Sequence, residues 1–156
     1  MKAFHFLRVA AVFTLLYCAG HTSGIPWTPY TDAEATSVVE TMKSHSFEEQ
    51  GFKGTYWDIY IGFGLVISVY LLVQAVVLWQ TASLARTDAV RVRPIVVSFF
   101  IAFVINTALS WKYFFVVPVV MAGLIAICLA IALVLAGRTQ AAERSDSSNK
   151  PVPAAI

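Results

Sequence analysis

This sequence has few charged residues for its length. Only 13% of its 156 residues are Asp, Glu, Lys or Arg, whereas a soluble domain carries about 25%. Four long stretches hold no charge at all, and in chain order they contain 23, 27, 18 and 25 residues. They lie between Arg8 and Asp32, between Asp58 and Arg86, between Arg93 and Lys112, and between Lys112 and Arg138. Because a helix of about 20 apolar residues crosses a bilayer, each stretch is long enough, or nearly so, for a membrane span.

Other absences narrow the possible chemistry. A net charge of +2 gives no basis for nucleic-acid binding. Cys18 and Cys128 lie in different apolar stretches without CxxC spacing, which favours packing over metal or redox chemistry. The sequence contains no nucleophile elbow and no phosphate loop. No carboxylate lies deep in a span, so a proton relay lacks its usual residue. We therefore expect no metal and no cofactor.

These stretches predict an all-α fold, a polytopic membrane protein built as a bundle of four transmembrane helices. The expected spans are residues 6–23, 57–82, 94–111 and 114–136, within a single membrane domain of residues 1–137. Residues 24–56 form the first outer loop. After Gly137 the chain contains Ser, Asn and Pro, so residues 138–156 are predicted to be a disordered cytoplasmic tail.

The outer loop carries a helix signal. Thr31 precedes Glu34 by three residues, which is the spacing of a capping box. Apolar residues then recur at helical spacing, so a short amphipathic helix is expected from Asp32 to Lys43. Two glycines in the segment 47–55 favour a flexible approach to the second span.

Prolines and small residues mark the ends and faces of the spans. Pro26 and Pro29 should end the first helix, whereas Pro94 and Pro118 suit the first turns of the third and fourth. The third and fourth helices should meet in a tight outer turn at residues 111–113. Small residues that let helices approach closely form two stripes. These stripes are Gly64, Ser68 and Ala75, and Ala122, Ala126 and Ala130.

The first helix has a second interpretation. Lys2 and Arg8 precede an apolar segment, as in a secretory signal. Tyr17 stands before Cys18, where lipoprotein cleavage requires a small residue. An uncleaved helix is favoured, and a cleaved signal stays open.

Basic residues predict the orientation. With the N-terminus inside, the inner segments hold eight cations and the outer segments three. Cations are retained on the cytoplasmic side, so both termini should be cytoplasmic. Aromatic residues agree: one group marks the outer surface and Trp79 marks the inner end of the second span. The outer group is Trp27, Tyr56, Trp57, Tyr60, Trp111 and Tyr113.

Polar residues near the outer ends of the spans define a candidate ligand-binding site. Its predicted members are His21, Trp57, Asp58, Tyr60, Asn106 and Trp111. His21 and Asp58 are also candidates for acid–base catalysis. Each has a structural alternative. Asp58 can cap a helix or pair with Lys112, His21 can bond free carbonyls at a helix end, and Asn106, like Gln74, can join helices.

Two short motifs resemble a group of small bacterial four-helix integral membrane proteins with no assigned activity. These proteins tend to show Gly-His-Thr at the end of the first helix, and Trp-Asp followed by Gly-Phe-Gly at the start of the second. The matching positions are Gly20, His21, Thr22, Trp57, Asp58, Gly62, Phe63 and Gly64. The resemblance implies a four-helix bundle in a bacterial cytoplasmic membrane and implies no substrate. The layout is more loosely similar to DoxX-like and sterol-isomerase-like membrane proteins. Small multidrug exporters differ, because they carry a carboxylate in the first span.

Three functional hypotheses follow. The first is a non-catalytic protein of the bacterial inner membrane that binds a small apolar or lipid-like ligand, or a membrane partner, through an outer-side cavity. The second is a membrane-embedded enzyme that acts on a lipid or quinone with His21 and Asp58. The third is a structural subunit of a membrane complex or homo-oligomer, joined through the two small-residue stripes.

Overall fold

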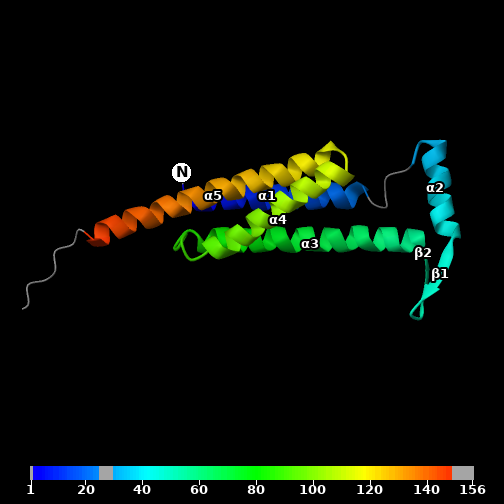
Figure 1. The fold of residues 1–156 in the computed structure, drawn as a ribbon, viewed down its shortest axis with the longest axis horizontal. Helices are drawn as coiled ribbons and strands as arrows, with labels where there is room; N and C mark the ends of the chain where they lie inside the picture. The colour runs from blue at the N-terminus through cyan, green and yellow to red at the C-terminus, as the bar shows by residue number, and fades with distance from the viewer. Residues whose placement is uncertain (1, 25–29, 149–156) are drawn as a thin grey trace, which may run out of the picture. The chain divides into compact units, whose positions relative to one another are not determined.

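The computed structural model describes residues 2–24 and 30–148 and is 81% helical, with five helices in that part of the chain. Four are long and apolar enough to cross a membrane. These are α1 (Ala3–Gly24), α3 (Tyr56–Leu84), α4 (Arg93–Tyr113) and the Val116–Arg138 part of α5 (Val116–Ser148). Along the chain, α2 (Ala33–Ser44), β1 (Ser46–Glu49) and β2 (Phe52–Thr55) separate α1 from α3 (Figure 1). The four predicted apolar helices are confirmed. Pro26, Trp27, Pro29 and the last eight residues lie outside the described part.

The chain divides into two compact units. The first unit comprises residues 1–14 and 74–156, and so contains the start of α1, the end of α3, and all of α4 and α5. The second unit comprises residues 15–73, with the end of α1, α2, the two strands and the start of α3. Whether the membrane part behaves as one domain stays a prediction.

Helix packing forms the core of the first unit. Helices α4 and α5 lie side by side (Figure 1), and Phe103 from α4 and Ile125 and Leu129 from α5 are almost fully buried. Gly123 on α5 faces Thr107 on α4, because a Cβ atom there would lie 3.9 Å from the threonine methyl group. Lipid tails are as apolar as these side chains, so in a bilayer the hydrophobic effect would not drive the helices together. Van der Waals packing of this kind would hold them instead.

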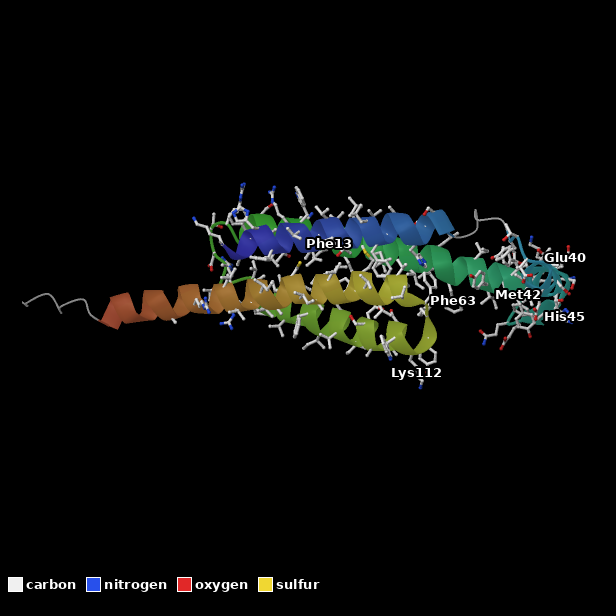
Figure 2. The ribbon with its side chains drawn as sticks, turned by 90° about the horizontal axis from the view of Figure 1, so that it is seen from above. Phe13, Glu40, Met42, His45, Phe63 and Lys112 are labelled. Atoms are coloured by element: carbon white, nitrogen blue, oxygen red, sulfur yellow. The ribbon has the colours of Figure 1, made fainter. Side chains whose placement is uncertain are left out.

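The ends of α4 and α5 follow the prolines. Pro94 lies in the first turn of α4, and Pro118 is the third residue of α5, where a missing N–H costs little. The predicted tight connection between the third and fourth helices is present, but it lies at residues 114–115 and not at 111–113, because α4 continues through Tyr113. Its end is closed by the N–H of Phe114, which donates to the Ser110 carbonyl at 2.9 Å. Lys112 projects from this end of α4 (Figure 2).

The disordered tail predicted for residues 138–156 begins in a segment that the structure describes as helical, and residues 149–156 lie outside the described part. Helix α5 continues through Gly137 to Ser148. The reason is local propensity, since the segment 141–144 reads Ala-Ala-Glu-Arg, all strong helix formers. The first helix-breaking residue after this segment is Pro151.

Helix α2 forms where the sequence predicts it, but Asp32 caps it instead of Thr31. The Asp32 carboxylate accepts a hydrogen bond from the Ala35 N–H at 3.1 Å. Val39 is the buried residue of this helix, whereas Val38 is 55% exposed. The side chains of Glu40 and Met42 and, just past the helix end, His45 appear in Figure 2.

The predicted flexible approach at residues 47–55 is instead an antiparallel hairpin of β1 and β2. Ser46 pairs with Thr55, and Glu49 pairs with Phe52. Gln50 and Gly51 form the two-residue loop with φ values of 51° and 85°. Positive φ at both loop residues is the type I′ geometry that matches strand twist. Gly51 therefore creates a defined turn, not flexibility.

Candidate functional site

Three residues near the end of α1 make hydrogen bonds to two residues of α3, all within the second unit. The Cys18 thiol donates to the Ser68 carbonyl at 3.3 Å. His21 Nε2 lies 3.0 Å from the Gly64 carbonyl oxygen, and Thr22 Oγ1 donates to Ser68 Oγ at 2.8 Å. Cys18 bonds to Ser68, whereas the later His21 bonds to the earlier Gly64, as expected where two helices run antiparallel. We call Cys18, His21, Thr22, Gly64 and Ser68 the α1–α3 polar cluster.

The hydrogen bonds of this cluster form a connected network. Thr22 donates to Ser68, whose hydroxyl donates to the Gly64 carbonyl at 3.2 Å. The same carbonyl receives His21, and because a carbonyl oxygen can only accept, the proton must lie on Nε2. Gly64 is buried, so its carbonyl has lost water and gains two side-chain donors. The network joins α1 to α3.

The predicted small-residue stripe on α3 takes part in this contact. Gly64 and Ser68 both face α1 of the same chain. On α5, Ala122 and Ala126 are buried as well. Small residues at these positions therefore serve contacts or burial within one chain.

Asp58 has a different partner, Thr55. The Asp58 carboxylate accepts hydrogen bonds from the Thr55 N–H and the Thr55 hydroxyl, both at 2.8 Å. In return the Asp58 N–H donates to Thr55 Oγ1 at 3.2 Å. This reciprocal pattern is a capping box at the start of α3. Asp58 precedes Gly64 by six residues, about 9 Å along the helix axis, so Asp58 and His21 are bound to separate parts of α3.

Trp57 is the centre of an aromatic group. Its ring lies 6.3 Å from that of Tyr30, edge-on, and 5.5 Å from that of Tyr60. Lys43 Nζ lies 5.0 Å from the Trp57 ring centroid, within cation–π range. Partial burial, and then the Tyr60 hydroxyl, raise the pKa of Tyr30. We call Tyr30, Lys43, Trp57 and Tyr60 the Trp57 cluster.

The predicted site residues thus fall into separate groups. Trp57 and Tyr60 come together, while His21 and Asp58 each engage another residue. Asn106 is half-buried on α4 and Trp111 is 79% exposed near its end, both in the first unit. A pocket that joins all six residues stays a prediction.

Sequence reasoning missed Tyr30 and Lys43 as neighbours of Trp57, because both come from the segment that precedes the hairpin. It also missed the bonds of Cys18 and Thr22. A usable signal existed, because Cys18 and Thr22 are four residues apart, so they share a helix face.

The two resembling motifs meet in the α1–α3 polar cluster, through His21 from the first and Gly64 from the second. Across residues 2–24 and 30–148, no three His, Cys, Asp or Glu side chains gather in a way that could hold a metal ion. No family model, no curated protein and no solved structure matches the chain, so the site is interpreted from its own geometry.

Proposed function

We propose that this chain is a non-catalytic, multi-pass protein of the bacterial inner membrane with both termini in the cytoplasm. It binds a small apolar or lipid-like ligand, or a membrane partner, at the outer ends of its helices. The observation that carries the proposal is the outward exposure of large apolar side chains on helices of membrane-spanning length.

That exposure is extensive. On α3, Phe63 is 67% exposed, Val69 60% and Tyr70 63%, and on α5 Val116 is 68% exposed. Soluble monomers rarely expose contiguous apolar patches larger than a few hundred Å². Hydrocarbon is the solvent that suits these faces, and the long charge-free stretches supply the length to cross it.

A structural role for the polar residues supports the non-catalytic interpretation. His21 donates to a backbone carbonyl and Asp58 caps α3. A general base must lie about 2.6–3.2 Å from the proton that it removes, directly or through one water. Both side chains instead satisfy groups of the fold.

The Trp57 cluster is the surface best suited to a ligand. Tyr30 is 45% exposed and Tyr60 43%, so their rings remain partly accessible. Aromatic rings with a polar end, joined by a lysine ammonium, suit the boundary between hydrocarbon and water. A ligand with an apolar body and a polar head fits this chemistry.

Membrane topology is tested with single cysteines in a variant that lacks Cys18 and Cys128. Ser44→Cys, at the end of α2, should react with a membrane-impermeant maleimide from outside intact cells. Thr87→Cys, between α3 and α4, should react only after the cells are opened. Reaction of Thr87→Cys alone in intact cells contradicts the proposed orientation. Reaction of both cysteines in intact cells contradicts it too.

Ligand binding is tested with a diazirine-bearing fatty acid as photoprobe, mapped by mass spectrometry. We expect labelled peptides around Trp57 in the purified protein, and loss of most of that labelling in Trp57→Ala. Tyr70→Ala is the matched control, because Tyr70 is an exposed aromatic residue of α3 outside the cluster. Equal labelling of all exposed apolar faces in both variants contradicts a site at Trp57. Loss of labelling in His21→Ala with intact folding would instead indicate that the ligand lies near His21.

A further inference from the structure

Two arginines at the other ends of α1 and α3 lie on aromatic rings within the first unit. The Arg8 guanidinium lies 4.3 Å from the Trp79 ring centroid. The Arg86 guanidinium, just past the end of α3, lies 5.1 Å from the Phe4 ring centroid. Phe4 and Arg8 are four residues apart on α1, about 6 Å along the axis and on one face. Both cations therefore lie where the start of α1 meets the end of α3.

Among the side chains that the structure describes, no carboxylate forms an ion pair with Arg8 or Arg86. The nearby Asp88 accepts a hydrogen bond from the Arg91 N–H at 2.9 Å and shapes the loop. The Arg8 Nε atom is buried and has no hydrogen-bond partner. A buried guanidinium N–H without an acceptor is costly.

From this geometry we infer that Arg8 and Arg86 form a binding site for the phosphate headgroup of an anionic phospholipid. A guanidinium presents its N–H groups as a planar fork that matches two phosphate oxygens. The terminal N–H groups of Arg8 and the exposed guanidinium of Arg86 can offer such a fork to a phosphate. The Trp79 and Phe4 rings lie against the two cations and limit their motion.

The surroundings favour a lipid over free phosphate. Val12 and Val76 lie one turn from Arg8 and Trp79 on the same helices, and they are 46% and 47% exposed. An acyl chain attached to the phosphate would cover this apolar surface, which a free phosphate ion cannot do. Basic sites between membrane helices recognise anionic headgroups in this way. The inference requires membrane insertion and is independent of the orientation and of the Trp57 cluster.

Native mass spectrometry of the purified protein in detergent tests it. Dioleoyl phosphatidylglycerol and dioleoyl phosphatidylcholine are added in equal amounts, with inorganic phosphate as a competitor in a third sample. We expect phosphatidylglycerol to be bound at least fivefold more than phosphatidylcholine, and inorganic phosphate at tenfold excess to leave this ratio unchanged. The double variant Arg8→Gln/Arg86→Gln should lose the preference. Lys112→Gln removes a cation near the C-terminal end of α4, away from the loop that carries Arg86, and this variant should retain the preference for phosphatidylglycerol.

Equal binding of the two lipids by the native chain overturns the inference. Retention of the preference in the double variant also overturns it, and so does displacement of the lipid by inorganic phosphate, which would indicate a free-anion site. Because Arg8 is partly buried, the double variant can fail to fold. Arg86 is exposed beyond the end of α3, and Arg86→Gln alone should still lower the lipid preference at least twofold at unchanged helicity. No change in that variant counts against the site.

Discussion

His21 Nε2 lies 3.0 Å from the carbonyl oxygen of Gly64, 43 positions later in the chain. This contact joins α1 to α3 and occupies the one histidine that sequence reasoning connects with catalysis. The imidazole acts as a hydrogen-bond donor between the two helices. Its removal should therefore lower the stability of the fold.

We expect His21→Ala to destabilise the folded chain in detergent by about 0.6 kcal/mol, the average measured for hydrogen bonds between membrane helices, and by no more than about 1.7 kcal/mol. The reason is the loss of one donor to a buried carbonyl that Ser68 only partly serves. Unfolding titrated with dodecyl sulfate and followed by circular dichroism measures the change. His45→Ala is the control, because His45 is exposed and bonds only to its own helix end. An equal effect of both variants would show that the α1–α3 contact has no special weight.

The capping box predicts that Thr55 and Asp58 act as a unit. Asp58→Ala and Thr55→Val should each speed the local opening of the first turn of α3, because each removes bonds of the capping box. The double variant should cost little more than either single one, since the same bonds are lost. Hydrogen exchange of the amides in residues 55–59 measures this local opening. Fully additive effects would contradict the reciprocal bonding.

The hairpin turn predicts opposite effects from two neighbouring substitutions. Gly51→Ala places a Cβ at φ 85° and should weaken the hairpin by about 1–2 kcal/mol. Gln50→Asn should strengthen it, because asparagine tolerates positive φ better than glutamine. Amide exchange in β1 and β2 measures both. Gly20→Ala is the control, since a Cβ there meets nothing within 4 Å. A neutral Gly51→Ala would rule out the type I′ turn.

The four apolar helices were predictable because a charge-free stretch directly measures how far a chain can extend through hydrocarbon. The hairpin was not, because Gln50-Gly51 lacks the Asn-Gly or Asp-Gly signature and two glycines suggest freedom. The extension of α5 was hidden by the polar composition of its tail, although Ala141 to Arg144 favour a helix. A polar or glycine-containing composition therefore predicts disorder poorly where local sequence favours a helix or a defined turn.

The candidate site was only partly predictable for a similar reason. His21 is visible in the sequence, but its partner is the backbone of Gly64, which no residue pattern identifies. The role of Asp58 was accessible, because Thr55 precedes it by three residues, the same spacing that suggested a cap for α2. In α2 that spacing misplaced the cap by one residue, since Asp32 itself caps.

The central claim is that α1 and α3 are joined by the polar cluster within one chain. The most direct test is disulfide formation in native membranes between Thr22→Cys and Ser68→Cys, in a variant with Cys18→Ser and Cys128→Ala. The two hydroxyl oxygens lie 2.8 Å apart, so mild oxidation should link the two cysteines within a monomer, as read by mass spectrometry of the joined peptides. Thr22→Cys with Val66→Cys is the matched control, because position 66 is half-exposed and faces away from position 68 on α3. An intramolecular link between positions 22 and 68, and little between 22 and 66, is the predicted result. No link at 22 and 68, or equal linking of both pairs, would contradict the account.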